Sequence, residues 1–393
     1  MKVLQFITRL DLGGAQETCL QQCRLLLRRG DEVHLLTAAG GELMGDARAL
    51  SGLRLHVWSD WAHAVGPLRD LRCLLRLARM LRRERFDLLH THCSKAGLVG
   101  RLAAAVAGGP TRVIHHVHGW SFNPIQPWPV RRAFVALERL AARPGFVLLT
   151  CSEATAEEGR RERIGREEDR RVLHYGIDRR PNLRRRGREA IRRRLGLGPR
   201  DVLFLQVGNL KPQKDPLTFA LASVEAGRVL SRAHFWIVGD GPLRAEAGRI
   251  AREGGLARRF RILGWRRDVP DLLAAADVLV LTSRFEGLPI ALLRGMAAGL
   301  PIVATRVNGT PEAVERAGFL VRPADPEAVA AAFVALGRSP RLRRIMGQRG
   351  RRRSARFTEQ RAAIETLALY QRTNGTRGDL HRGRRVGREG QPD

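Results

Sequence analysis

Two charged side chains in separate loops could bind a ligand that carries both phosphate and hydroxyl groups. Lys214 lies in VGNLKPQKDP (residues 207–216) and is one of only four lysines in a chain whose positive charge is otherwise arginine. A flexible ammonium at a strand end suits a diphosphate, because it neutralises the charge that develops when a bond to phosphate breaks. Glu286 lies in TSRFEGLPIALL (residues 282–293), where its carboxylate can accept hydrogen bonds from hydroxyl groups.

Backbone N–H groups near two predicted helix starts add candidate anion-binding positions. Gly13 and Gly14 follow an apolar run and precede a helical pattern, so their backbone can approach a phosphate closely. Their spacing is not Gly-x-Gly-x-x-Gly, so a dinucleotide is not indicated, and a simple tight turn is the alternative. The backbone N–H groups of Gly287 and Leu288, which precede Pro289 at a predicted helix start, point toward whatever anion lies beside Glu286.

Histidines crowd two other predicted strand ends. The cluster consists of His90, His92, Cys93, His115, His116 and His118. By itself the cluster suggests a metal site. Histidines that line a polar cleft explain it more simply, and we expect no metal. The spacing indicates no Ser-His-Asp or Cys-His arrangement.

The elements that position these residues alternate between strand and helix, twice over. Strand patterns occupy residues 1–7, 30–38, 52–58, 86–92, 111–119, 145–152, 170–178, 201–208, 233–239, 259–264, 277–283, 301–305 and 318–321. Strands separated by helical patterns predict parallel sheets with helices on both faces. The predicted fold class is therefore α/β, with two doubly wound Rossmann-like domains. Ligands of such sheets bind beyond the carboxyl ends of the strands, which places the site in the cleft between the domains.

Net charge and cysteine content limit the classes of function. The chain carries 70 Lys+Arg against 39 Asp+Glu, a net charge of +31. Such an excess attracts polyanions, and an arginine-rich coding bias is the alternative. The aromatic platforms and motifs of nucleic-acid binding are lacking, so no nucleic-acid partner is expected. Five cysteines without CxxC spacing indicate a reducing compartment.

The sequence predicts a cytoplasmic protein and leaves membrane contact open. The first residues do not resemble a signal peptide, and no stretch reaches the ~18 apolar residues of a spanning helix. Residues 68–83 and 120–143 are basic and amphipathic, as in segments that lie on an anionic membrane surface. Helices that pack one face on a sheet explain them equally well. Peripheral association with the inner face of the plasma membrane is therefore an alternative.

Together these segments resemble the retaining glycosyltransferases of family 4, which have the GT-B fold. The resemblance covers about residues 1–370 and is strongest over 207–216, 238–243 and 264–311. HCSKAGLVGRLAA and HHVHGWSFNP are similar to the N-terminal segments of that family. The resemblance implies transfer of a sugar from a nucleotide-sugar donor with retention of anomeric configuration.

Domain boundaries follow from composition and from this resemblance. Residues 1–180 are expected to form the acceptor-side domain and 201–356 the nucleotide-sugar-binding domain, facing each other across the cleft. The arginine-dense stretch 181–200 is expected to be a basic linker. Residues 357–372 are expected to form a helix that crosses back to the first domain, and 373–393 a disordered basic tail.

The resemblance also implies a role for each site residue. The catalytic residues would be Lys214, which holds the diphosphate, Glu286, which binds sugar hydroxyls, and His118, which contacts the donor sugar. The remaining donor-binding positions would be Gly13, Gly14, Asn209, Gly239, Gly287, Leu288, Pro289 and Arg294. No cofactor or metal is expected beyond the nucleotide-sugar co-substrate.

Three positions depart from the family pattern. Arg294 replaces a Glu that usually binds ribose hydroxyls, Asn209 replaces an Arg, and Tyr175 replaces an Asn. Losing a carboxylate–hydroxyl bond at position 294 costs roughly 1.5–3 kcal/mol of donor affinity. Arg294 could instead pair with Glu286 or with a phosphate.

The predicted function is therefore glycosyl transfer to a glycan, glycolipid or polysaccharide acceptor, as in lipopolysaccharide or capsule biosynthesis. A lipid-linked acceptor would favour membrane contact. Two alternatives remain open: a non-catalytic GT-B scaffold that lost donor binding through Arg294, and a sugar-nucleotide epimerase.

Overall fold

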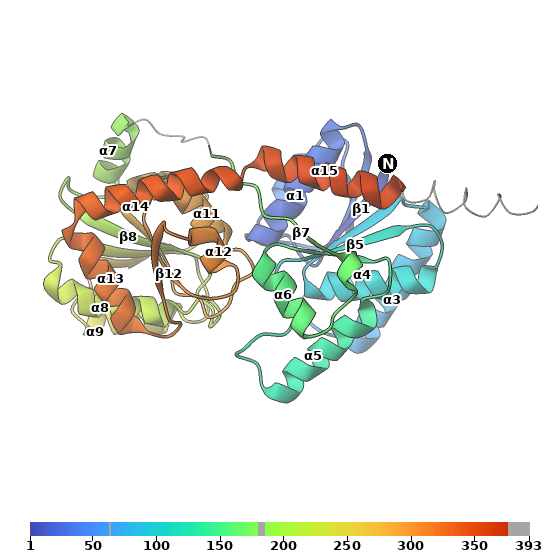
Figure 1. The fold of residues 1–393 in the computed structure, drawn as a ribbon, viewed down its shortest axis with the longest axis horizontal. Helices are drawn as coiled ribbons and strands as arrows, with labels where there is room; N and C mark the ends of the chain where they lie inside the picture. The colour runs from blue at the N-terminus through green and yellow to red at the C-terminus, as the bar shows by residue number, and fades with distance from the viewer. Residues whose placement is uncertain (63, 180–184, 376–393) are drawn as a thin grey trace, which may run out of the picture.

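The computed structural model describes residues 1–62, 64–179 and 185–375, which form two α/β domains side by side (Figure 1). The strands of the N-terminal domain are β1 (Lys2–Ile7), β2 (Glu32–Ala38), β3 (Arg54–Trp58), β4 (Leu88–His92), β5 (Arg112–Val117), β6 (Val147–Thr150) and β7 (Arg170–Val172). Its helices are α1 (Gly14–Arg28), α2 (Met44–Arg48), α3 (Pro67–Glu84), α4 (Ser94–Ala107), α5 (Trp128–Ala141) and α6 (Glu153–Arg161).

The C-terminal domain repeats the same plan. Its strands are β8 (Val202–Val207), β9 (Ala233–Val238), β10 (Phe260–Ile262), β11 (Val278–Leu281), β12 (Ile302–Thr305) and β13 (Gly318–Val321). Its helices are α8 (Pro216–Val229), α9 (Arg244–Glu253), α10 (Val269–Ala275), α11 (Ile290–Ala297), α12 (Thr310–Val314), α13 (Pro326–Arg338) and α14 (Pro340–Arg353).

Strand order confirms the predicted pair of doubly wound sheets. The seven-stranded sheet has the order β3-β2-β1-β4-β5-β6-β7 and the six-stranded sheet the order β10-β9-β8-β11-β12-β13. In each sheet the order reverses beside the first strand, between β1 and β4 and between β8 and β11. Loops diverge to opposite faces at such a switch point and leave a crevice at the carboxyl ends of the strands.

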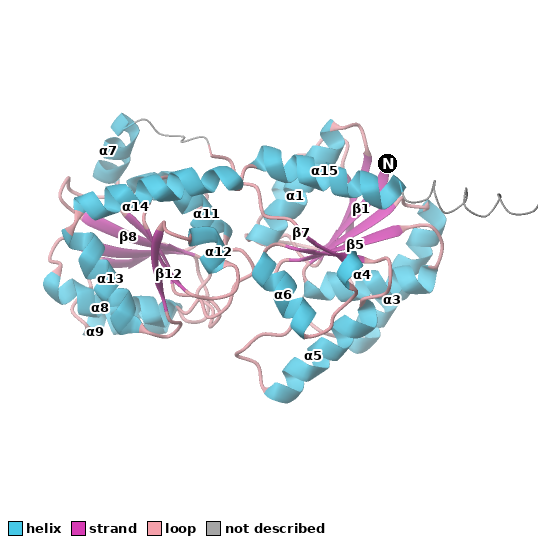
Figure 2. Ribbon diagram, in the orientation of Figure 1, coloured by secondary structure: helices cyan, strands magenta, loops and turns pink. Residues whose placement is uncertain are grey.

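Both faces of each sheet are covered by helices (Figure 2). The strands are accordingly near-continuous apolar runs rather than alternating ones; β8, for example, is VLFLQV with five of its six residues buried. Phe204, Phe235 and Phe333 form one aromatic group in the C-terminal core, with the rings of Phe204 and Phe333 4.6 Å apart. The sheets are thus rigid platforms, and the loops at their carboxyl ends carry the polar residues.

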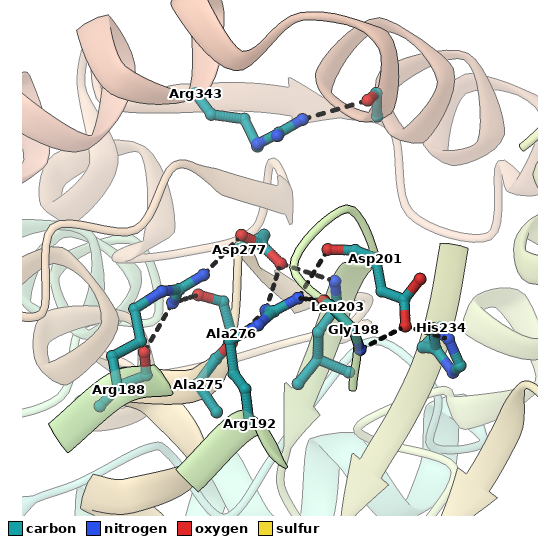
Figure 3. A network of polar contacts seen from close by, with 12 residues as sticks. Arg188, Arg192, Gly198, Asp201, Leu203, His234, Ala275, Ala276, Asp277 and Arg343 are labelled. Atoms are coloured by element: carbon teal, nitrogen blue, oxygen red, sulfur yellow. Dashed lines mark hydrogen bonds and ion pairs between the residues drawn. The ribbon is translucent and has the colours of Figure 1, made fainter. Parts of the chain in front are cut away.

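Part of the stretch expected to be a linker forms a helix on the C-terminal domain. This helix, α7 (Arg185–Arg194), lies beside α10, and two of its arginines share a carboxylate in the segment between α10 and β11 (Figure 3). Arg188 Nη2 and Arg192 Nη1 lie 2.7 and 2.9 Å from the two carboxylate oxygens of Asp277. Asp277 also accepts a hydrogen bond from the Leu203 N–H. Arg188 and Arg192 therefore anchor α7 at the amino ends of β8 and β11.

The last described helix, α15 (Glu359–Gly375), returns to the N-terminal domain (Figure 1). Its residues Leu369 and Tyr370 are buried in the core that also contains Val3 and Leu35. The helix extends three residues beyond the expected end at residue 372, and the rest of the expected tail, 376–393, lies outside the described residues. No helix among the described residues is long and apolar enough to span a membrane.

Candidate active site

A cleft of about 1220 Å³ separates the two domains and is lined by both. Loops that follow four strands contribute the predicted residues: Gly13 and Gly14 after β1, His118 after β5, Asn209 and Lys214 after β8, and Glu286 to Pro289 after β11. Arg294, one turn into α11, also lines the cleft. Because β8 and β11 are neighbours at the switch point, Lys214 and Glu286 emerge next to each other.

Lys214 and Glu286 form an ion pair on the floor of the cleft. The ammonium Nζ donates to Glu286 Oε1, and the two side chains are 19% and 7% exposed. The same oxygen accepts a hydrogen bond of 2.6 Å from Ser283 Oγ. Each charge compensates the other, which a nearly buried carboxylate requires. An ammonium has three donors, so Lys214 can bind a phosphate and keep its contact with Glu286.

The backbone around Lys214 is held rigidly. Thr282 Oγ1 donates to the Lys214 carbonyl over 3.1 Å and to the Asp215 carbonyl over 2.8 Å. Asp215 has φ 45° and caps α8, accepting from the N–H and hydroxyl of Thr218. A buried threonine directly after β11 thereby fixes the loop that presents the lysine.

Two helix N-termini from opposite domains meet at the cleft. Gly14 begins α1, and a Cβ at this position would lie 2.8 Å from Cδ1 of Ile290, the first residue of α11. Gly287 is more constrained, because its Cβ would lie 2.2 Å from the carbonyl oxygen of His118. Glycine at both positions therefore permits close approach of the two domains. The positive ends of both helix dipoles are near the cleft, where they favour an anion.

One predicted position, Gly239, lies outside the cleft lining, and Arg294 has a partner that the sequence did not indicate. Gly239 is not among the cleft-lining residues; its Cβ would lie 2.0 Å from the Gly208 carbonyl oxygen, so a glycine is needed there for packing of adjacent loops. Arg294 does not pair with Glu286. Its Nη2 lies 2.5 Å from Oε2 of Glu17 on α1, so it forms an ion pair between domains. Asn209 lines the cleft, and its Oδ1 is buried without a hydrogen-bond partner among the described residues.

Further polar contacts join the two domains beside the cleft. Ser152 Oγ donates to the Gly287 carbonyl over 3.2 Å, and the Glu153 N–H donates to Glu312 Oε2 over 2.9 Å. Asn308 Nδ2 donates to Glu158 Oε2 over 3.3 Å. Burial at this interface raises the pKa of Glu158 to about 7, although Arg131 acts in the opposite direction. These contacts stabilise the relative orientation that the two domains have in this structure.

The histidine cluster lies directly beneath the cleft. His118 is at its top and lines the cleft, but both ring nitrogens are used within the protein: Nε2 lies 3.0 Å from His92 Nδ1, and Nδ1 lies 2.6 Å from the Tyr175 hydroxyl. Burial lowers the pKa of His92 and His118 well below the usual value, and burial lowers that of His116 to about 3. The rings are therefore neutral at physiological pH.

Sequence reasoning missed two residues that complete the site. Glu17 is the partner of Arg294; its position in the first turn after Gly13-Gly14 was the available signal. Tyr175 had been noted only as a departure from the family pattern. It lines the cleft and binds His118, a contact that spacing along the chain does not reveal.

Fold and site together define a class: two facing doubly wound domains with a lysine–carboxylate pair and two helix N-termini in the shared cleft. This arrangement is the GT-B architecture. Comparison with known proteins agrees, since residues 12–180 match the family described as Glycosyltransferase Family 4 and residues 201–339 match Glycosyl transferases group 1.

Individual relatives point the same way. UDP-Gal:alpha-D-GlcNAc-diphosphoundecaprenol alpha-1,3-galactosyltransferase of Escherichia coli is 31% identical over 316 residues, covering 79% of this chain and 81% of the relative. N-acetyl-alpha-D-glucosaminyl L-malate synthase of Bacillus anthracis is 24% identical, and the match covers 93% of this chain and 97% of the relative. The structure of Anabaena HepE in complex with UDP and glucose superposes with a TM-score of 0.80 at 21% identity. The superposition covers 94% of this chain and 99% of HepE. The chain belongs to the family 4 glycosyltransferases, and it is an enzyme that transfers a sugar from a nucleotide-sugar donor.

Proposed function

We propose that this enzyme transfers a hexose from a nucleoside-diphosphate sugar to a lipid-linked glycan acceptor, with retention of anomeric configuration. The observation that carries the proposal is the Lys214–Glu286 pair at the switch point of the C-terminal sheet. In this proposal Lys214 and the N-terminus of α11 neutralise the diphosphate as it leaves. Glu286 accepts hydrogen bonds from the hydroxyl groups of the sugar.

The lipid-linked acceptor is supported by the name of the Escherichia coli relative, whose acceptor is a diphosphoundecaprenol-linked sugar.

The N-terminal domain also supports a lipid-linked acceptor, because the outer face of α5 combines apolar and basic side chains. Trp128 and Leu140 are 71% and 64% exposed, and Arg132 and Arg139 are exposed on the same helix. Exposed tryptophan and arginine on one helix favour an anionic lipid surface. We therefore propose peripheral attachment through α5, on the cytoplasmic side where nucleotide sugars are made available.

The first experiment is a panel of nucleotide sugars tested by thermal shift and then by turnover with a polyprenyl-diphosphate-linked acceptor. A donor stabilises the folded state according to its affinity, and UDP-sugars are the first probes. Lys214→Ala is expected to abolish the shift and turnover. NMR of the product anomeric proton tests retention. Absence of any shift with millimolar nucleotide sugars would favour the scaffold alternative, and release of an epimerised sugar without acceptor would favour an epimerase.

Membrane attachment has its own test. The purified full chain is expected to sediment with vesicles that contain phosphatidylglycerol and not with pure phosphatidylcholine vesicles. Trp128→Ser combined with Leu140→Ser should reduce sedimentation without changing turnover of a short-chain soluble acceptor. Equal sedimentation of this variant and the parent would contradict attachment through α5, and it would leave the proposed chemistry intact.

A further inference from the structure

The two tyrosines of this chain, Tyr175 and Tyr370, lie at opposite ends of one chain of hydrogen bonds. Tyr370 belongs to α15 and is 1% exposed; Tyr175 lines the cleft and is 5% exposed. Gln5 Nε2 donates to the Tyr370 hydroxyl over 3.1 Å, and Gln5 Oε1 lies 2.7 Å from His92 Nε2. Gln5 and His92 are both fully buried, so these groups cannot exchange their partners for water.

The chain continues from His92 to the cleft. His92 Nδ1 lies 3.0 Å from His118 Nε2, and His118 Nδ1 lies 2.6 Å from the Tyr175 hydroxyl. The ring of His118 stacks on that of His116 with centroids 4.1 Å apart. The ring of His118 is thus held at both nitrogens and on one face.

Proton positions along this chain follow from the orientation of a single amide. Because Gln5 Oε1 faces His92, the His92 Nε2 must carry a hydrogen, and its Nδ1 must be an acceptor in the neutral ring. His118 Nε2–H then donates to His92, and His118 Nδ1 accepts from the Tyr175 hydroxyl. In this amide orientation Gln5 Nε2 donates to the Tyr370 hydroxyl, whose own hydrogen is then directed at His90 Nδ1.

We propose that Tyr370 is a remote positioning residue for the cleft, because the hydrogen-bonded chain that begins at its hydroxyl fixes the tautomer and orientation of His118. The ring of His118 then cannot act as an acid or base toward the substrate, since neither nitrogen is free. Instead it presents a fixed surface beside the donor site. This inference rests on the proposed function only in placing the donor sugar near His118.

A bound metal is the competing explanation of the same cluster. Ligand atoms of His90, His92 and His116 lie within 4.8 Å of one another, and both nitrogens of His116 lack a hydrogen-bond partner among the described residues. A metal on His92, however, would have to displace Gln5 or His118 from a ring nitrogen. The hydrogen-bonded chain and metal ligation by His92 are therefore mutually exclusive.

The direct test reads the tautomer of His118 without using activity. NMR of the full chain with nitrogen-15-labelled histidine is expected to show His118 protonated at Nε2 and not at Nδ1, with the assignment made from the loss of its signals in His118→Gln. The Nδ1–H tautomer, an imidazolium, or a stoichiometric metal bound at His92 in the purified protein would overturn the proposal. Because the readout needs no donor, it can succeed even if the proposed sugar chemistry fails.

The remote effect is tested with Tyr370→Phe, which keeps the ring and removes only the hydroxyl. Removing one buried hydrogen bond should lower kcat/KM about tenfold and give His118 a mixed tautomer signal. The matched control is Thr366→Val, which removes another buried hydroxyl from α15; that hydroxyl donates to the Ala362 carbonyl over 2.7 Å and is outside the chain. Equal kcat/KM for both variants, with the His118 signal unchanged, would overturn the proposal.

A second pair of variants keeps the test valid if Tyr370→Phe unfolds. His92→Asn retains a side-chain hydrogen-bond acceptor for His118, whereas His92→Leu retains only side-chain volume. The asparagine variant is expected to keep at least five times more kcat/KM than the leucine variant, compared per folded molecule. Equal loss in the two variants would assign His92 to packing alone and would contradict the proposal.

Discussion

Arg294 of the C-terminal domain and Glu17 of the N-terminal domain form an ion pair across the cleft, with Nη2 and Oε2 2.5 Å apart. The two side chains are 40% and 28% exposed. The cation at position 294 is therefore neutralised by the opposite domain. In this enzyme the relative position of the two domains and the electrostatics of the cleft are linked.

Breaking this pair should weaken donor binding modestly. Partly exposed ion pairs contribute about 0.5–1 kcal/mol, so Arg294→Ala should raise the donor KM about two- to fivefold. Glu17→Ala should raise it by a similar factor, because it leaves Arg294 without its partner. The double variant Glu17→Ala with Arg294→Ala should lose little more than either single variant, because the pair is already broken. Steady-state kinetics of the three variants check this, with Arg249→Ala, which breaks an exposed pair within α9, as the control.

Lys214 and Glu286 should be energetically coupled as well as essential. Removing either partner leaves the other charge unpaired in a largely buried site, which costs about 3–5 kcal/mol of stability. Lys214→Met combined with Glu286→Leu should therefore be less destabilised than the sum of the single variants. Denaturant unfolding measures this coupling, and additive destabilisation would show that the pair does not act as a unit. All three variants should lose turnover.

Gly287→Ala tests the close approach of the domains. The added methyl group would lie 2.2 Å from the His118 carbonyl oxygen and 2.7 Å from Cys151 Sγ. Because the His118 contact is to backbone, the loop of Gly287 or that of His118 must move. The value of kcat/KM should therefore fall at least about tenfold, since small displacements at a site have large effects on rate. Gly45→Ala, whose Cβ would meet nothing within 4 Å, is the control. Unchanged kinetics for Gly287→Ala would mean that the two loops do not pack closely in solution.

Glu158 predicts a pH dependence of stability. Its pKa rises from 4.5 to about 7 on burial between the domains, so the folded state binds more protons than the unfolded state between these values. The stability that comes from protonated Glu158 is therefore fully present below about pH 4.5 and is lost as pH rises through about 7.

Glu158→Gln should remove this component of the pH profile and raise the free energy of unfolding at pH 8 by roughly 1–3 kcal/mol. Denaturant unfolding between pH 5 and 8 measures it, with exposed Glu153→Gln on the same helix as the control. A profile for Glu158→Gln that parallels the parent would refute the assignment.

The fold was predictable from the sequence because buried parallel strands leave apolar runs of a length that helices rarely share. The neighbouring positions of Lys214 and Glu286 were also predictable, since each follows a strand and strand ends of a parallel sheet share an edge. The partner of Arg294 was not predictable from the sequence, because Glu17 is 277 residues away and belongs to the other domain. Gly239 was expected in the cleft only from the family resemblance, whereas the position of the Gly208 carbonyl explains why a glycine is needed there.

The return of α15 to the first domain has a consequence for synthesis. Leu369 and Tyr370 complete a core whose other members include Val3 and Leu35, yet they leave the ribosome after the whole second domain. Domains generally fold in the order in which they emerge, but here the core of the earlier domain stays incomplete until α15 emerges. Premature termination between the second domain and α15 would thus release a chain whose N-terminal domain, although synthesised first, lacks part of its core.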